Sequence, residues 1–285
     1  MDIKTGKLVL CATPIGNLED ITFRVVKALE EADMIAAEDT RNSLKLLNHF
    51  DIKKPMTSYH EHNKYEKAEQ LIGEMKKGKV IALVTDAGTP AISDPGEVIV
   101  KRCHEEGIEV TSLPGPAACI TALTLSGLST RRFCFEGFLP PDKKEKQEVL
   151  ERLKRETRTT VFYEAPHRLK KTLKEINAVI GNRKLTICRE LTKLHEEIIC
   201  TDILGAIEKY EVIEPKGEFV LVLEGKNVEE LQQESQEAFL MLDLEEHMKI
   251  YENQGIDRKE AMKKVAKDLG ISKREVYQKL LEKKE

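Results

Sequence analysis

Short apolar runs alternate with amphipathic segments through the first part of the chain. Residues 8–12 form an apolar run, which predicts a buried strand, whereas residues 20–32 carry apolar side chains at helical spacing. In that segment Ile21, Val25 and Leu29 share one face. The alternation continues, with strands predicted at residues 34–37, 80–85 and 108–113 and helices at 42–50, 64–77 and 97–106. This βαβα rhythm predicts a mainly parallel sheet with helices on both faces.

A second α/β region follows a predicted bridging helix from Pro116 to about Ser126. Its expected strands are residues 133–138, 159–163, 185–189, 196–201 and 219–223, and its expected helices are 143–156, 168–179 and 202–210. Two of the strands follow each other within residues 185–201 without a helix between them. This favours a mixed sheet in the second region.

Beyond Gly225 the pattern becomes helical. Residues 226–235 are acidic and rich in glutamine, which indicates a linker or a solvated helix. Helices are predicted at residues 239–252, 257–268 and 272–283. Gly270 is expected to cap the end of one helix and Ser272 the start of the next, which resembles a helix-turn-helix.

The length and composition agree with several folded parts. At 285 residues the chain is too long for one ordinary core, and 40% hydrophobic with 34% charged residues is typical of a folded protein. We therefore expect an α/β fold with domains at residues 1–115 and 116–225, an acidic linker at 226–238 and a helical appendage at 239–285. No apolar run approaches membrane-spanning length and no signal peptide is visible, which predicts a cytoplasmic protein without membrane association.

Six cysteines are spread along the chain, and none forms a C-x-x-C pair or lies near a histidine at metal-ligand spacing. Most fall in apolar runs. This favours reduced thiols that pack as small hydrophobic groups, and no metal site is expected.

Charge is distributed unevenly. The net charge is −4, which by itself disfavours nucleic acid. Residues 224–247 carry eight acidic residues and one lysine, whereas residues 253–285 carry ten Lys/Arg against six Asp/Glu. The basic C-terminus is a weak nucleic-acid signal, because a basic helical surface is often only a solvated face.

The segment TDAGTPAISDPG, residues 85–96, directly follows a predicted strand. It contains two prolines, two glycines and two aspartates, which impose a specific backbone path. A plain helix start, with Asp94 as N-cap and Pro95 in the first turn, would explain its end but not Asp86 to Pro90. We therefore interpret it as a rigid loop that grips a small ligand at the carboxyl ends of the strands.

Four other segments occupy comparable positions. Residues 12–20 follow the first strand but lack the G-x-G-x-x-G spacing of a dinucleotide loop. Residues 114–118 either present free N–H groups to a ligand or simply start a helix. Residues 162–168 and 189–193 place charged side chains after strands of the second region, as functional groups or as half-exposed ion pairs.

Six motifs in order carry a family resemblance: ATPIGNLEDIT, AEDTR, DAGTPAISDPG, LPGPAA, FYEAPHR and CRELTK. They resemble the tetrapyrrole-methylase superfamily, the class III S-adenosylmethionine-dependent methyltransferases. Within it they are most similar to the family that 2′-O-methylates a cytidine in small-subunit (16S) ribosomal RNA. The match runs from Lys7 to about Gly225, and the C-terminal helices resemble that family's appendage. Small-molecule members usually have G-x-G-P-G in the first loop, so A-T-P-I-G-N favours the RNA branch.

The resemblance implies two α/β domains with S-adenosylmethionine between them, and a homodimer. Carried over motif by motif, the expected cofactor-binding residues are Pro14, Asp86, Ala87, Gly88, Ala91, Ala117, Ala118, Phe162 and Leu191. The expected partner is 16S rRNA or the assembled small ribosomal subunit.

The implied reaction is an in-line attack of a ribose 2′-hydroxyl on the sulfonium methyl, for which positioning supplies much of the catalysis. A base must accept the hydroxyl proton, and our candidates are Glu164, Glu190 and Asp39. Asn17 could orient the ribose. Candidate phosphate contacts are Arg41, His167, Arg168, Arg189 and Lys193.

Two alternatives remain open at this stage. The substrate could be a porphyrin-like small molecule, against which the first loop and the basic C-terminus argue. The chain could instead be an RNA-binding module without catalysis, against which the intact loop 85–96 argues. The C-terminal helices either contact phosphates or pack on the body or a second subunit.

Overall fold

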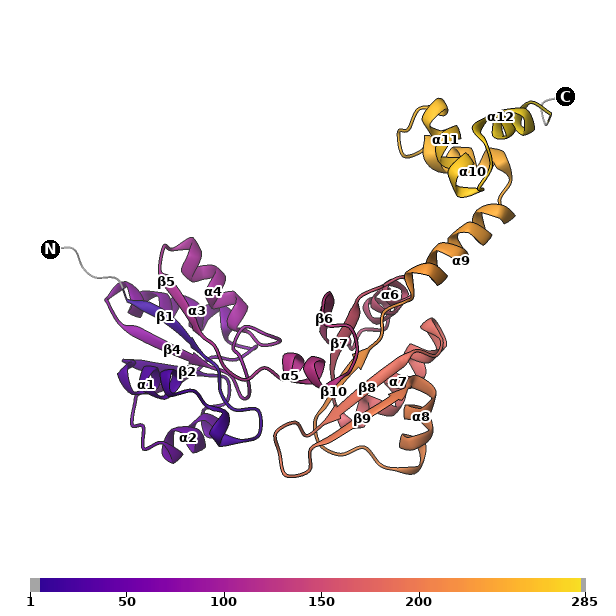
Figure 1. Ribbon diagram of the computed structural model, residues 1–285. Helices are drawn as coiled ribbons and strands as arrows, with labels where there is room; N and C mark the ends of the chain where they lie inside the picture. Colours follow the sequence, from indigo (N-terminus) through magenta and orange to yellow (C-terminus); the bar gives the residue numbers. More distant parts are fainter. Residues whose placement is uncertain (1–5, 283–285) are drawn as a thin grey trace. The chain divides into compact units, whose positions relative to one another are not determined.

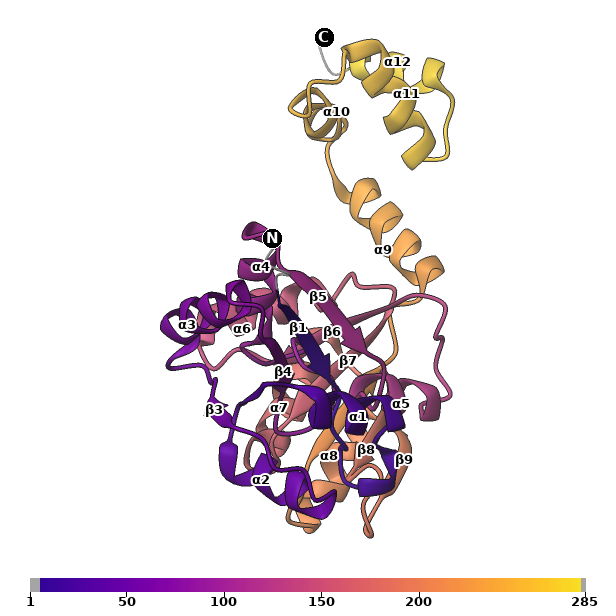
Figure 2. The same cartoon turned by 90° about the vertical axis from the view of Figure 1, so that its left-hand side faces the viewer.

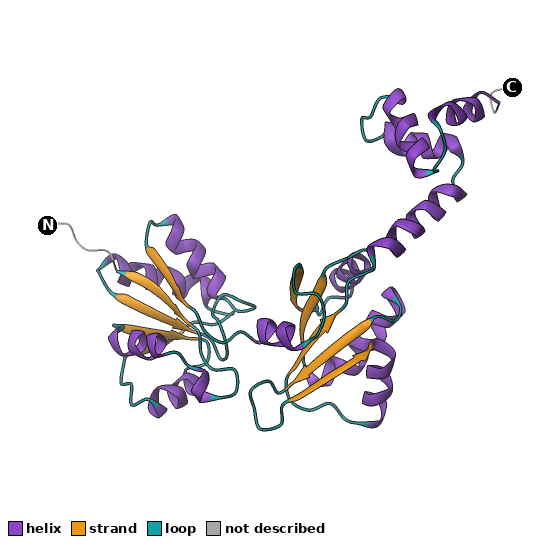
Figure 3. Ribbon diagram, viewed as in Figure 1, coloured by secondary structure: helices purple, strands orange, loops and turns teal. Residues whose placement is uncertain are grey.

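A computed structural model of the chain describes residues 6–282, apart from the side chains of residues 235–241 and 282. In this range residues 6–154 and 158–224 form one compact unit, and residues 155–157 and 225–282 form another. Figure 1 follows the chain through both units, and Figure 3 distinguishes their strands from their helices. The first unit contains both β-sheets.

The first sheet is parallel throughout. Its strands are β1 (Lys7–Cys11), β2 (Met34–Ala37), β3 (Met56–Ser58), β4 (Val80–Val84) and β5 (Glu109–Leu113), in the order β3-β2-β4-β1-β5. Apolar side chains of α1 (Phe23–Glu31) and α2 (Thr40–His49) cover one face, and those of α3 (Lys64–Lys76) and α4 (Gly96–Glu105) cover the other. The prediction of a parallel sheet covered on both faces is confirmed, and β3 is added to it.

The connections from the neighbouring parallel strands β1 and β4 run toward opposite edges of the sheet. From β1 the chain crosses to β2 on one side of the sheet, and from β4 it crosses to β5 on the other. Ligands bind open α/β sheets outside the carboxyl ends of the strands at such a switch point. The loops that follow β1 and β4 are therefore the natural walls of a site.

The second sheet is mixed, as predicted. Its strands are β6 (Phe133–Phe138), β7 (Thr159–Glu164), β8 (Lys184–Arg189), β9 (Glu197–Asp202) and β10 (Phe219–Leu223), in the order β6-β7-β10-β8-β9. Only β6 and β7 pair in parallel. The helices α6 (Lys143–Leu153), α7 (Pro166–Ile180) and α8 (Ile203–Val212) pack against one face of this sheet.

Helix α5 (Ala118–Leu125) covers the opposite face of the second sheet, together with Ile15 and Leu191. The expected helix start at Pro116 is wrong, because Ala117 has extended backbone angles (φ −145°, ψ 112°) and the helix begins after it. The side chain of Ile15 comes from the loop after β1. The two α/β halves of the first unit therefore share a core.

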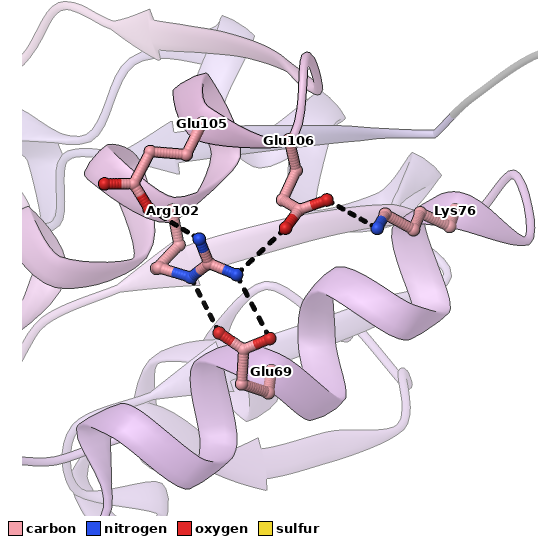
Figure 4. A network of polar contacts seen from close by, with 5 residues as sticks. All are labelled: Glu69, Lys76, Arg102, Glu105 and Glu106. Atoms are coloured by element: carbon pink, nitrogen blue, oxygen red, sulfur yellow. Dashed lines mark hydrogen bonds and ion pairs between the residues drawn. The ribbon is translucent and has the colours of Figure 1, made fainter.

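A network of charged side chains joins α3 to α4 (Figure 4). Arg102 donates from Nε to Glu69 Oε1 at 2.7 Å and from Nη2 to Glu106 Oε1 at 3.0 Å. Its Nη1 also donates to Glu105 at 2.5 Å, and Lys76 Nζ donates to Glu106 at 2.6 Å. Several partners on one guanidinium fix its geometry better than an isolated surface pair does. The network thus fastens two helices that cover the same face of the first sheet.

The second unit is formed by α9 (Val228–Met241), α10 (Leu244–Glu252), α11 (Arg258–Asp268) and α12 (Lys273–Glu282). Helices α10, α11 and α12 pack together around Met248, Val265 and Val276 (Figure 2). The single helix predicted over residues 239–252 is wrong, because the chain leaves the helical path and Asp243 starts α10 by accepting from the Glu245 N–H.

The turn between α11 and α12 agrees with the prediction. Gly270 has φ +64°, a conformation that favours glycine after a helix. The Ser272 hydroxyl accepts from the Glu275 N–H at 3.2 Å, and the Glu275 carboxylate accepts from the Ser272 N–H at 2.7 Å. This reciprocal capping box starts α12. Lys283, the expected end of that helix, lies outside the described residues.

None of the helices within residues 6–282 combines the length and the apolar character that a bilayer-spanning segment needs.

Candidate active site

Hydrogen bonds tie together the three loops that leave the carboxyl edge of the first sheet. Thr13 and Gly88 exchange two backbone hydrogen bonds, of 2.9 and 3.0 Å. The Thr13 hydroxyl donates to the Thr85 carbonyl at 3.3 Å, and the Thr89 hydroxyl donates to the Pro116 carbonyl at 2.9 Å. Gly88 has φ +85°, so a side chain there would be strained. The loops are therefore held in place by their own contacts.

Asp94 shapes the remainder of loop 85–96. Its carboxylate accepts from the N–H groups of Ala91 at 3.0 Å, Ile92 at 3.2 Å and Gly96 at 2.7 Å. Ala91 and Ser93 both have positive φ, at 68° and 63°, which non-glycine residues rarely adopt. Such strain persists only where the surroundings over-determine the backbone, and here Asp94 supplies the constraint.

The loop after β1 presses against the loop after β8. A Cβ atom on Gly16 would lie 2.7 Å from Thr192 Oγ1 and 2.9 Å from the Leu191 carbonyl oxygen. Glu190 and Thr192, which flank Leu191, have φ of 51° and 66°. A second strained turn therefore packs against the loop after β1.

A cavity of about 470 Å³ lies among these loops. Five of its lining residues are alanine or glycine, namely Ala87, Gly88, Ala117, Ala118 and Ala165. Apolar lining residues contributed by the second sheet and its loops include Phe138, Tyr163, Leu191 and Val220. This size and this mixture are typical of sites for small organic ligands.

The charged side chains that line the cavity in the described part of the chain are all acidic. Five carboxylates line it, from Glu38, Asp86, Asp94, Glu164 and Glu218, and none of its described lining residues is Lys, Arg or His. Some are neutralised locally, since Glu218 accepts from Lys193 at 3.0 Å. The field still favours a cationic ligand and disfavours a phosphate.

Asp86 and Glu38 form the least compensated part of this wall. The Thr85 hydroxyl donates to Glu38 Oε2 at 2.7 Å, and the Asp39 N–H donates to Asp86 Oδ1 at 3.1 Å. Burial, and then the charge of Glu38, raise the pKa of Asp86. Sequence reasoning did not select Glu38. The motif AEDTR could have indicated Glu38, because it begins at the last residue of β2, which lies beside β4 in the sheet.

The comparisons with known proteins agree on one class. Residues 7–206 match the family described as Tetrapyrrole (Corrin/Porphyrin) Methylases. The chain belongs to this methylase family.

Relatives much closer in sequence share one name, Ribosomal RNA small subunit methyltransferase I. The protein of Halalkalibacterium halodurans is 49% identical over 95% of this chain and 93% of its own length. The Bacillus subtilis protein is 48% identical over the same shares of both chains. The Thermotoga maritima protein is 48% identical over 78% of this chain and 99% of its own. The predicted methyltransferase class is thereby confirmed.

Several solved structures show the same fold at low sequence identity. Diphthine synthase aligns with a TM-score of 0.60 at 15% identity, covering 78% of this chain and 91% of its own. Uroporphyrin-III C-methyltransferase from Thermus thermophilus, solved with S-adenosyl homocysteine, aligns with a TM-score of 0.56 at 18% identity over 77% and 97%. The predicted α/β fold of the tetrapyrrole-methylase type, with two sheets, is therefore confirmed.

Most of the expected cofactor residues converge on the cavity. Its lining includes Asp86, Ala87, Gly88, Ala117, Ala118 and Leu191. Pro14 lines a separate pocket of about 200 Å³ instead. Phe162 is only 1% exposed and packs in the core of the second sheet, while the next residue, Tyr163, reaches the cavity. Ala91 is not among the lining residues, but the adjacent Ile92 is. The binding roles stay predictions.

The three candidate bases differ in their surroundings. Glu164 lines the cavity but is 2% exposed, and its carboxylate accepts from the Thr172 hydroxyl at 2.5 Å and the Ala165 N–H at 2.8 Å. For Glu190, burial would raise the pKa, but hydrogen bonds from Lys193 and the Glu218 N–H outweigh it and lower that pKa. Glu190 does not line the cavity.

Asp39, the third candidate, is also outside the lining residues. It caps α2 by accepting from the Arg41 N–H at 2.8 Å, and the Arg41 guanidinium donates to it at 2.7 Å. The side-chain hydrogen bond from Arg41 lowers the pKa of Asp39 to about 2. A carboxylate held this strongly in its charged form is a weak base.

The expected RNA contacts fall into two groups. Arg168 donates to the Leu139 carbonyl at 2.7 Å, Arg189 donates to the Lys216 carbonyl at 2.6 Å, and Lys193 bridges Glu190 and Glu218. These three cations hold the loops of the second sheet in place. Arg41, His167 and Asn17 are exposed, although Asn17 also caps a short 3-10 helix by accepting from the Glu19 N–H.

Proposed function

We propose that this protein transfers a methyl group from S-adenosylmethionine to the 2′-hydroxyl of a cytidine in small-subunit ribosomal RNA. The observation that carries the proposal is the match over 95% of the chain to relatives named for methylation of that RNA. The methyl donor follows from membership of a methylase family. A tetrapyrrole-like substrate is the weaker alternative, since these relatives are named for RNA.

The cavity suits S-adenosylmethionine on physical grounds. The molecule carries positive charge on its sulfonium and its amino group, and the lining supplies five carboxylates and no cation among the described residues. The small side chains of Ala87, Gly88 and Ala117 leave room for it, and Leu191 offers an apolar contact. When bound there, it supplies a methyl group on a good leaving group.

We propose Asp86 as the proton acceptor, because its carboxylate lines the cavity beside Glu38. The attacking hydroxyl must lose a proton, and a carboxylate with a raised pKa accepts it better than an ordinary one. Asp86 lines the cavity, and its pKa is raised by burial and by Glu38. Glu164 is better described as a positioning residue, because its oxygens already hold Thr172 and the start of α7.

Glu38→Gln should extend activity to lower pH. Transfer requires ionised Asp86, so the rate falls as the pH drops through the pKa of Asp86. Removing the negative charge of Glu38 lowers that pKa, whereas Asp39 and Arg41 keep their effects on it. Single-turnover rates measured against pH should therefore show an acid limb displaced downward. An acid limb that stays in place or moves upward would argue against Asp86 as the base.

The decisive test of the function uses labelled S-adenosylmethionine with three acceptors offered separately: unmodified small ribosomal subunits, naked small-subunit rRNA and porphyrinoids. We expect label in a ribose 2′-O of the RNA. Label in the porphyrinoid alone would replace the proposal with the alternative. Light scattering on the same preparation tests the expected homodimer.

The helical second unit is proposed to add phosphate contacts. Exposed cations on α11 and α12 include Lys264, Lys267, Arg274 and Lys279. The core of α10 to α12 is formed by residues of this unit, so its removal takes no side chain from the cores around the sheets.

Truncation after Gly225 should therefore weaken RNA binding while S-adenosylmethionine binding, measured by calorimetry, stays within about twofold. The slope of log affinity against log salt should decrease by about 0.7–0.9 for each phosphate that the truncated protein no longer neutralises. An unchanged slope with weaker binding would show that the unit acts by packing instead.

A further inference from the structure

Strand β6 contains a β-bulge next to the cavity. Phe135 pairs with Val161 on β7, but Phe162 pairs with Gly137, so Glu136 is an extra residue in β6. Residues three apart in a regular strand point to opposite faces of the sheet. The bulge changes this relation, since it shifts every later side chain of β6 to the other face.

Ring contacts show the effect on Phe138. The rings of Phe135 and Phe138 both meet the ring of Tyr163 edge-on, with centroids 4.9 Å and 5.6 Å away. Both phenylalanines therefore lie on the face that α5 covers, where the cavity opens. Without the bulge Phe138 would point to the opposite face.

Phe138 is exposed despite lining the cavity. Half of its surface (50%) reaches solvent, and Ile92 of loop 85–96, which is 45% exposed, lines the same cavity. Gly137 has φ +62°, and a Cβ there would lie 3.0 Å from Ser93 Oγ. The end of β6 and loop 85–96 thus approach each other closely, and each contributes an exposed apolar side chain to the cavity lining.

A guanidinium is anchored just after the end of β6. Arg168 Nη2 donates to the carbonyl of Leu139, the residue after Phe138, at 2.7 Å. The Arg168 side chain stays 28% exposed. Its Nε also lies 3.6 Å from Glu164 Oε1, so its charge is partly neutralised. The exposed aromatic ring is itself a common feature of sites for single-stranded RNA, because such a ring stacks on an unpaired base.

We propose that Phe138 is the stacking platform for the base of the acceptor nucleotide, which enters the cavity between Phe138 and Ile92. The inference rests on the proposed function. Phe138 lines the cavity and still has 50% of its surface exposed, so its ring is accessible to a ligand larger than the cofactor. Stacking would hold the nucleotide while its ribose meets Asp86.

The test compares Phe138→Ala with Phe133→Ala. Phe133 lies on the same strand and is 38% exposed, but it does not line the cavity, so it is a matched control. With small ribosomal subunits, Phe138→Ala should raise KM for RNA about tenfold or more, while the Kd for S-adenosylmethionine stays within about twofold. Phe138→Tyr should restore KM because it keeps an aromatic face, and Phe133→Ala should match the wild type.

Three outcomes would overturn the stacking role. One is an unchanged KM in Phe138→Ala, and another is an equal rise in Phe133→Ala. The third is a weaker Kd for S-adenosylmethionine with an unchanged KM for RNA, which would assign Phe138 to the methyl donor. Failure of the proposed function itself would look different, because the wild-type protein would then label no ribosomal RNA.

Discussion

Asp86→Asn should lower the single-turnover rate of methyl transfer by about 100-fold or more, the usual contribution of a general base. Asparagine has nearly the same shape and keeps an oxygen that can accept from the Asp39 N–H, which lies 3.1 Å from Asp86 Oδ1. The loop should therefore hold its conformation while the proton acceptor is removed. The rate is measured with saturating S-adenosylmethionine, and its Kd is measured separately because Asp86 also lines the cofactor cavity.

The comparators for this experiment are the other carboxylates proposed from the sequence. Glu164→Gln and Glu190→Gln should each keep the rate within about tenfold. The Glu164 carboxylate is occupied by hydrogen bonds, and Glu190 lies outside the cavity lining. If either variant abolished transfer while Asp86→Asn kept it, the proton acceptor would have to be reassigned. Loss of cofactor binding in Asp86→Asn would make Asp86 a binding residue and leave Glu38 as the next candidate.

Gly16→Ala should displace the turn around Leu191 and weaken S-adenosylmethionine binding by tenfold or more, since misplacement by about 1 Å in a site can cost a factor of about 100. The new Cβ would lie 2.9 Å from the Leu191 carbonyl oxygen and 2.7 Å from Thr192 Oγ1. Backbone atoms in a strained turn can move only at an energetic cost. We therefore also expect the free energy of unfolding to fall by about 1–3 kcal/mol.

Gly73→Ala is the matched control for that substitution. Gly73 lies inside α3 and nothing is within 4 Å of its added Cβ, so alanine should stabilise the protein by about 1 kcal/mol without affecting the cofactor. Calorimetric Kd values and denaturant unfolding curves for both variants separate the two effects. Wild-type affinity in Gly16→Ala would show that the two loops are not fixed against each other when the cofactor binds.

Elements with a clear hydrophobic periodicity could be predicted from the sequence. Very short elements, and boundaries that depend on a single residue, could not. The parallel sheet and the mixed sheet follow from apolar runs such as residues 80–85 and 219–223. Strand β3 has only three residues, all half-buried, and gives no periodic signal. The break before α10 depends on one capping aspartate, Asp243, within an otherwise helical pattern.

The site was predictable as a set of loops and less so as a set of side chains. Loop 85–96 was recognisable by its prolines and glycines. Glu38 was missed and Asp39 chosen because adjacent carboxylates look alike in sequence, although only one of them lines the cavity. Phe138 was missed for a geometric reason, since the bulge that aims it at the cavity is an interruption of strand pairing that its own sequence does not display.

The separate core of the helical unit bears on how proteins of this kind diverge. The Thermotoga maritima relative is matched over 99% of its length by 78% of this chain, so roughly a fifth of this chain has no counterpart there. A segment that buries its own apolar residues can be gained, lost or exchanged as a unit, because no other surface of the protein has to change with it. A helical unit with its own core can therefore change between relatives while the cores around the two sheets stay the same.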